Sequence, residues 1–172
     1  ANPSSTTAGG ISRPPGKRSA TMDKGVYALV LENPDCVVRV GARGAREFSA
    51  GRHVYVGSAR GSGGLARADR HVRLARERDR PPRWHIDYLL LDPRFTLAAV
   101  VTAATDRDCE CDLARAIGRS SVPGFGCSDC ACPSHLFYRP DNPVPEVFAA
   151  FRGLGLDARI TSIKNERDED RL

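Results

Sequence analysis

The stretch "HVYVGSARGSGGLARADRH", residues 53–71, constrains the fold more than any other part of the chain. It begins with β-branched and aromatic residues, passes through a loop of small residues, and continues as an arginine-rich helical pattern. This order predicts a strand, a tight turn and a helix whose N-terminus lies beside the sheet. Small residues allow a ligand to approach the backbone, and a helix N-terminus attracts anions. The turn is therefore a candidate phosphate site, and its backbone candidates are Gly57, Gly61, Gly63 and Gly64.

Two common nucleotide-binding motifs do not fit this turn. The letters "GSGGLA" match the outline of a dinucleotide-binding turn, but such a site needs parallel strand–helix–strand units and an acidic residue near the end of the next strand. Here an arginine-rich segment follows, and few strands remain. A P-loop is excluded because no Gly-Lys-Ser/Thr follows the glycines. A nucleic-acid backbone is the better candidate for the phosphate.

Length and composition predict one domain. A chain of 172 residues with 41% hydrophobic content can bury one ordinary core. We expect the domain over residues 22–160, a disordered N-terminal extension over 1–21 and a charged tail over 161–172. No apolar run is long enough for a membrane span or a signal peptide, so a cytoplasmic protein without membrane partners is expected. In that reducing compartment, six cysteines suggest metal ligands or free thiols rather than disulfides.

Positive charge is concentrated in one segment. The chain carries a net charge of +5, and residues 60–83 alone carry +5, with eight arginines against three acidic residues. Such a patch is typical of proteins that bind a phosphate backbone, although a solvated helix face is an equal alternative on charge alone. The proposed nucleic-acid contacts are Arg60, Arg73, Arg76 and Arg83, and DNA is favoured over RNA.

Hydrophobic periodicity predicts the order of the elements. We expect strands over 25–32, 36–41, 51–58 and 95–104, and helices over 64–79, 84–91, 109–118 and 144–155. Residues 42–51 are rich in turn-forming residues, and residues 120–140 form a cysteine-rich loop that ends in a short strand.

The spacing Cys127-x2-Cys130-x-Cys132-x2-His135 is typical of a metal site. Four soft ligands within nine residues, next to Gly and Pro, fit a tetrahedral Zn²⁺ site, and Cys109 or Cys111 is able to replace one of them. The alternative is a set of reduced cysteines packed around a tight turn.

A carboxylate is expected on the apolar face of the helix over 109–118. Glu110 shares that face with Leu113, Ala114 and Ile117. A carboxylate there is costly unless a cation or hydrogen-bond donor is close, and a metal ion or Arg67 meets that need. A structural ion pair with an arginine is the alternative.

Two further helices carry candidate polar residues. Spacings of three and four place Arg67, Arg70 and His71 on one side of the helix over 64–79. His71 and His85 are candidates for proton transfer or phosphate contact. Asp87 is a possible second metal ligand or the partner of a histidine. Alternatively, "WHIDYLLL" is mainly core, and His85 and Asp87 only cap or pair.

Together these motifs resemble the GIY-YIG nuclease superfamily. Its paired motifs are similar to "GVY" at residues 25–27 and "YVG" at residues 55–57. The segments "YVGSARGSGGL", "RHVR", "WHIDYLL", "EC" and "GFGCSDCACPSHLFY" resemble, more closely, an uncharacterised archaeal and bacterial family assigned to that superfamily. Some members of that family are fused to a base-excision endonuclease. The resemblance covers residues 24–139.

The resemblance implies an α/β (α+β) fold with a small, mainly antiparallel central sheet flanked by helices. The long gap between the two motifs implies an inserted hairpin around "GARGAREFSAG". The implied activity is a metal-dependent DNA endonuclease, with a possible DNA-repair partner protein. Tyr27 would be the base or water-positioning group, Tyr55 its partner, Arg67 the phosphate clamp and Glu110 the ligand of one Mg²⁺ or Mn²⁺. Arg70 is an alternative to Arg67 for this role, because the step from Leu65 to Arg67 is one residue shorter than the usual leucine-to-arginine step of the superfamily. A non-catalytic nucleic-acid-binding module is the alternative function.

Overall fold

The computed structural model describes residues 23–126 and 130–163. The predicted N-terminal extension, Cys127 and most of the predicted charged tail lie outside these residues. None of the helices in the described part is long and apolar enough to cross a membrane.

The described residues form a five-stranded antiparallel sheet in the order β6-β4-β1-β5-β7. A second sheet of two strands, β2 and β3, is inserted between β1 and β4 as a hairpin. The fold class and the inserted hairpin are therefore confirmed. The strands are β1 (Gly25–Asn33), β2 (Cys36–Arg39), β3 (Ala45–Phe48), β4 (Gly51–Ala59), β5 (Thr96–Ala104), β6 (Leu136–Arg139) and β7 (Arg159–Ser162). The helices are α1 (Ala66–Glu77), α2 (His85–Leu90), α3 (Glu110–Ile117) and α4 (Val144–Gly153), with a 3-10 turn at Gly41–Arg43.

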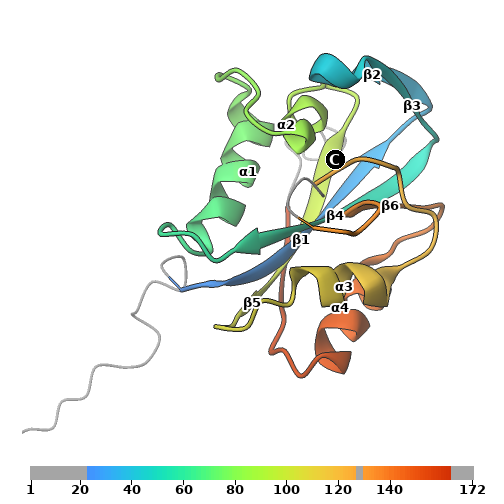
Figure 1. Cartoon of the computed structure of the whole chain (residues 1–172). Helices are drawn as coiled ribbons and strands as arrows, with labels where there is room; N and C mark the ends of the chain where they lie inside the picture. The colour runs from blue at the N-terminus through green and yellow to red at the C-terminus, as the bar shows by residue number, and fades with distance from the viewer. Residues whose placement is uncertain (1–22, 127–129, 164–172) are drawn as a thin grey trace, which may run out of the picture.

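Helices cover both faces of the sheet (Figure 1). Since successive side chains of a strand point to opposite faces, β1 at the centre contributes to two separate cores. Tyr27, Leu29 and Leu31 pack on the side of α1, α2 and the hairpin, whereas the alternate residues of β1 pack on the side of α3 and α4. This burial on both faces explains why β1 is almost continuously hydrophobic.

The register of β1 and β4 explains the glycine of the "YVG" motif. Tyr27 on β1 is paired with Gly57 on β4. A Cβ atom at Gly57 would overlap the ring of Tyr27, so a residue with a side chain would displace that ring. Gly57 therefore makes the space in which Tyr27 lies.

Two strands were not predicted. β3 lies within the segment that was expected to be turn-rich, and it is held by its ladder with β2 and by the burial of Phe48. β7 pairs with the edge of β5, and all four of its residues are exposed. Because it contributes backbone hydrogen bonds but no buried face, it has no hydrophobic pattern to detect.

Candidate functional site

Most of the predicted catalytic residues line one cleft of about 580 Å³. Tyr27 comes from β1, Tyr55 from β4, Arg67 and His71 from α1, and Glu110 from α3. These elements are far apart in the sequence: β1 and β4 belong to the sheet, and α1 and α3 cover its opposite faces. We call this space the cleft; its other lining residues are Ser58, Arg60, Trp84, Asp108, Cys111, Gly126, Cys130 and His135.

Tyr27 and His71 form a buried hydrogen bond. The hydroxyl oxygen of Tyr27 lies 2.8 Å from Nε2 of His71. Burial, assisted by Arg67 and Arg70, lowers the pKa of His71 to about 3, so the imidazole is neutral at pH 7. Burial, with Tyr55 as the next cause, raises the pKa of Tyr27 well above its usual value. Both residues are therefore uncharged. Because Nδ1 of His71 faces the carboxylate of Asp87, we assign the ring proton to Nδ1, so that Nε2 accepts from the tyrosine hydroxyl.

Asp87 faces the other nitrogen of the same histidine. Its Oδ2 accepts the backbone N–H groups of Arg83 and Trp84 at 2.8 and 3.0 Å, which fixes the start of α2. Its Oδ1 lies 3.8 Å from Nδ1 of His71 and has no hydrogen-bond partner in the described part of the chain. Asp87 is buried and does not line the cleft that Glu110 lines. This position corresponds to the predicted role of orienting a histidine, and not to that of a second metal ligand.

Three arginines surround the ring of Trp84. The guanidinium carbons of Arg67, Arg70 and Arg83 lie 5.3, 4.7 and 5.7 Å from its centroid. Arg67 also donates from Nη1 to the carbonyl oxygen of Ser58 at 3.0 Å, which holds it in the cleft. Arg70 lies outside the cleft, so the geometry favours Arg67 over its rival as the arginine next to Tyr27 and Glu110. Within the described ranges, no acidic side chain forms an ion pair with any of these three arginines.

The glycine turn forms a second hollow of about 360 Å³ beside Arg67 and Arg70. Gly61, Gly63 and Gly64 line it. The backbone N–H groups of residues 64–68 already donate to the carbonyl oxygens of Gly61, Gly63, Gly64, Leu65 and Asp23. These N–H groups at the start of α1 are therefore not free to bind an anion, whereas the side chains of Arg67 and Arg70 line the hollow as donors.

His85 is not part of the cleft. It lines a smaller hollow of about 180 Å³, which shares Tyr55, Trp84 and Gly126 with the cleft, and it contacts Phe125 edge-on. Burial, together with Arg43, lowers its pKa. The sequence predicted the same role for His71 and His85, but only His71 lines the cleft with Tyr27 and Glu110.

The other predicted arginines differ in their surroundings. Arg60 lines the cleft and pairs with Asp108 at 3.4 Å. Arg73 pairs with Glu77 at 3.4 Å along α1, and both side chains are exposed. Arg76 and Arg83 are exposed. All of them are accessible to a large ligand.

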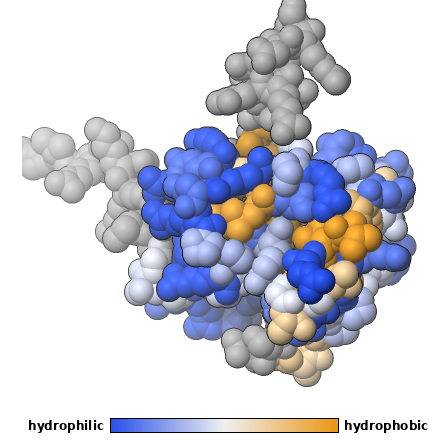
Figure 2. Space-filling view, turned by 90° about the horizontal axis from the view of Figure 1, so that it is seen from above, coloured by the Kyte–Doolittle hydropathy of each residue, from blue (hydrophilic) through white to orange (hydrophobic). Residues whose placement is uncertain are grey.

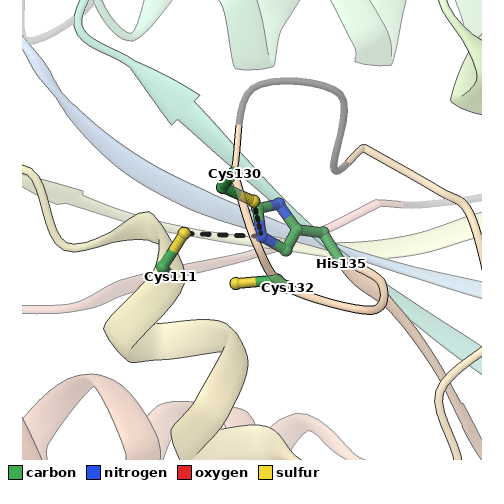
Figure 3. Close-up of side chains that lie close together, drawn as sticks. All are labelled: Cys111, Cys130, Cys132 and His135. Atoms are coloured by element: carbon green, nitrogen blue, oxygen red, sulfur yellow. Dashed lines mark hydrogen bonds between the residues drawn. The ribbon is translucent and has the colours of Figure 1, made fainter.

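The cysteine cluster consists of Cys111, Cys130, Cys132 and His135, whose side chains point toward one another (Figure 3). Their ligand atoms all lie within 4.8 Å of one another. Nε2 of His135 lies 3.8 Å from Sγ of Cys111 and 3.6 Å from Sγ of Cys130. This donor set and spacing can hold a metal ion.

Cys111 supplies the fourth ligand of the described cluster, and it is one of the two cysteines, Cys109 and Cys111, that the sequence offers as replacements. Cys111 belongs to the first turn of α3, whereas the other ligands belong to the loop before β6. Cys109 is instead the residue before α3 and is buried in the core between the sheet, α3 and α4. Cys127 lies outside the described residues.

Glu110 has a partner that the sequence analysis did not consider. Its Oε1 lies 2.8 Å from Nδ1 of His135, whose side chain is buried. Burial alone would lower the pKa of His135, but Glu110 and Cys132 outweigh it and the pKa is raised. A carboxylate on this face does need a partner, as predicted, but the partner is a histidine of the cysteine cluster. In the sequence, only the adjacent positions of Glu110 and Cys111 indicated that Glu110 lies next to the cysteine cluster.

The fold and the site define a mixed α/β protein with a cleft that contains tyrosine, arginine and carboxylate side chains next to a Cys/His cluster. The chain belongs to the family described as "Domain of unknown function DUF123", whose model matches residues 26–156. No curated protein and no solved structure matches the chain.

Proposed function

We propose that the protein is a metal-dependent endonuclease of the GIY-YIG type that hydrolyses phosphodiester bonds in DNA. The observation that carries this proposal is the convergence of Tyr27, His71, Arg67 and Glu110 on one cleft. Phosphodiester hydrolysis needs a proton acceptor for water, a cation for the phosphate and a carboxylate for a divalent metal ion. The cleft contains one candidate for each of these requirements.

The carboxylate of the cleft fits a hard cation. Mg²⁺ is usually bound by one or two carboxylates and keeps several waters, and Glu110 has a partly exposed side chain in the cleft. When bound there, Mg²⁺ or Mn²⁺ would neutralise the charge that develops on the phosphate. The thiolates of the cysteine cluster suit Zn²⁺ instead. We therefore assign Mg²⁺ or Mn²⁺ to Glu110 and Zn²⁺ to the cysteine cluster.

Tyr27, His71 and Asp87 form a path for the proton of the attacking water. As the water oxygen bonds to phosphorus, its proton passes to the hydroxyl oxygen of Tyr27, and the proton of Tyr27 passes to Nε2 of His71. Burial, Arg67 and Arg70 disfavour this imidazolium in the free protein, and in the complex the bound phosphate neutralises the two arginines while the carboxylate of Asp87 faces the charged ring. Arg67 binds the phosphate oxygens, and the bond from phosphorus to the leaving oxygen breaks, with solvent supplying a proton to that oxygen.

The charged surface supports a nucleic-acid partner. The guanidinium groups around Trp84 lack acidic partners among the described residues, and the face seen in Figure 2 is largely hydrophilic, with separate small hydrophobic patches. We favour DNA over RNA and a DNA-repair partner protein on the basis of the family resemblance. The reduced cysteine cluster supports a cytoplasmic location.

The test is cleavage of plasmid, single-stranded and branched DNA in Mg²⁺ or Mn²⁺. Tyr27→Phe and Arg67→Ala should each reduce cleavage by about 100-fold or more, since each removes a group that acts in the transition state. Tyr138→Phe is the matched control, because its hydroxyl donates to the carbonyl oxygen of Ala50 on an exposed part of the surface. Unchanged cleavage by both variants would mean that this cleft is not the active site.

A non-catalytic nucleic-acid-binding module is the second candidate. It is favoured by one observation, the engagement of Glu110 by His135, which competes with metal binding. Both candidate functions predict that the association constant for nucleic acid falls by about 0.9 log units per log unit of salt concentration for each phosphate contacted. Binding without cleavage of any substrate, in either metal, would establish the second candidate.

A further inference from the structure

We propose that the cysteine cluster is a structural Zn²⁺ centre and that Glu110 is its outer carboxylate, so that the Zn²⁺ centre positions the carboxylate to which we assign the divalent ion of the cleft. The Zn²⁺ centre rests on the cluster geometry alone. Its influence on the cleft rests on the proposed function.

The ligands come from two segments, and no disulfide joins these segments within the described residues. Cys111 is in the first turn of α3, and Cys130, Cys132 and His135 belong to the loop before β6. Three thiolates and one imidazole complete a four-coordinate shell without water, which is typical of structural rather than catalytic zinc. Binding of the ion would therefore fix this loop to the start of α3.

The two nitrogens of His135 face different partners. Nε2 points to the sulfur atoms of the cluster, and Nδ1 lies 2.8 Å from Oε1 of Glu110, an ion-pair distance at which the ring N–H is not aligned for a hydrogen bond. A histidine that ligates a metal through one nitrogen commonly donates the N–H of the other to a carboxylate, which fixes the tautomer and the ring orientation. His135 is buried, so water does not readily replace this carboxylate.

Glu110 is also fixed through its neighbour in the chain. It directly precedes Cys111, so a ligand of the ion and the outer carboxylate belong to the same helical turn. Zn²⁺ thus restrains Glu110 both through the backbone of α3 and through His135. Since Glu110 also lines the cleft, occupancy of the cluster should change the affinity of the cleft for a divalent ion, and the reverse effect must be equal.

The first experiment measures the metal centre without nucleic acid. The protein is purified and its zinc content determined, and Co²⁺ is then substituted to read the thiolate-to-cobalt and tetrahedral ligand-field absorption bands. We expect one equivalent of zinc and a tetrahedral cobalt spectrum. Cys111→Ser and Cys132→Ser should each lose both, whereas Cys36→Ser, a cysteine on β2, should retain them. Zinc binding that survives both cluster variants would overturn the assignment.

The second experiment measures the outer carboxylate by competition with a zinc chelator. Glu110→Gln keeps the size of the side chain and should weaken zinc binding by about 10- to 100-fold, as is usual when an outer-shell partner is removed. Asp112→Asn is the matched control: it removes one negative charge from the same helical turn, and its carboxylate is exposed and pairs with Arg115. Equal zinc affinities in these two variants would refute the role of Glu110.

Coupling to the cleft is read by Mn²⁺ binding, followed by electron paramagnetic resonance. Zinc-loaded and zinc-depleted protein should differ in their affinity for Mn²⁺, and Glu110→Gln should abolish the difference. An equal affinity in both forms would refute the coupling. None of these measurements depends on cleavage, so a zinc centre in a protein that cuts no DNA refutes the proposed function alone.

Discussion

Replacement of Tyr27 by phenylalanine tests whether the hydroxyl is part of a buried polar pair. The substitution keeps the ring, which fills the space above Gly57, and removes only the donor to His71. Because His71 is 2% exposed, water cannot take the place of the lost donor. Nε2 of His71 would then be a buried acceptor without a partner.

The size of the effect follows from this burial. A buried polar group that loses its hydrogen-bond partner costs about 1–3 kcal/mol. We therefore expect Tyr27→Phe to lower the free energy of unfolding by about 2 kcal/mol. Tyr138→Phe also removes one hydroxyl hydrogen bond, of 2.7 Å to Ala50, but at an exposed site where water replaces it. Its expected cost is below about 1 kcal/mol.

The assay is urea unfolding at pH 7, followed by the fluorescence of Trp84 and by far-ultraviolet circular dichroism. The quantity compared is the difference in unfolding free energy between the two tyrosine variants and the unmodified protein. If Tyr27→Phe costs no more than Tyr138→Phe, the hydroxyl of Tyr27 is not held by His71 as described. The proton path of the proposed mechanism would then also be wrong.

Two further predictions concern packing and pH. Gly57→Ala should lower the unfolding free energy by about 1–3 kcal/mol, because the added Cβ overlaps the ring of Tyr27. The control Gly63→Ala, whose Cβ has nothing within 4 Å, should change the unfolding free energy by less than about 0.5 kcal/mol. Equal changes for the two variants in urea unfolding would contradict the packing described. Burial lowers the pKa of His53 to about 4 and that of His71 to about 3, so between these values and pH 6.5 the unfolded chain binds more protons and stability rises with pH. From pH 7 to pH 5 these two histidines should together lower the unfolding free energy by about 3–4 kcal/mol, and the fall in His53→Gln should be smaller by about half of this amount. An equal stability at the two pH values would show that these histidines are not buried as neutral groups.

The main elements of the fold were predictable because they carry strong local signals. β1, β4 and β5 are rich in β-branched residues, and the glycine turn and the arginine-rich period predicted α1. The inserted hairpin followed from the long gap between the two tyrosine motifs. β7 was missed because an exposed edge strand is held by backbone hydrogen bonds to β5, which leave no pattern in the side chains.

The candidate site was predictable only in part. The types of residue were evident from the sequence: tyrosines in paired motifs, a carboxylate on an apolar helix face, and closely spaced cysteines. Their partners were not. The hydrogen bond between Tyr27 and His71 joins residues 44 positions apart, and the contact of Glu110 with His135 joins a helix to a loop.

The sequence by itself determined which chemical groups are present and which helix or strand carries most of them, because local periodicity and turn chemistry act over a few residues. Only the tertiary structure decided that Arg67 rather than Arg70 enters the cleft, that His85 does not, and that Cys111 joins the cysteine cluster. These choices depend on antiparallel strand register and on helix packing across both faces of the sheet. Both are set by the burial of the whole core, which no short segment of the sequence contains.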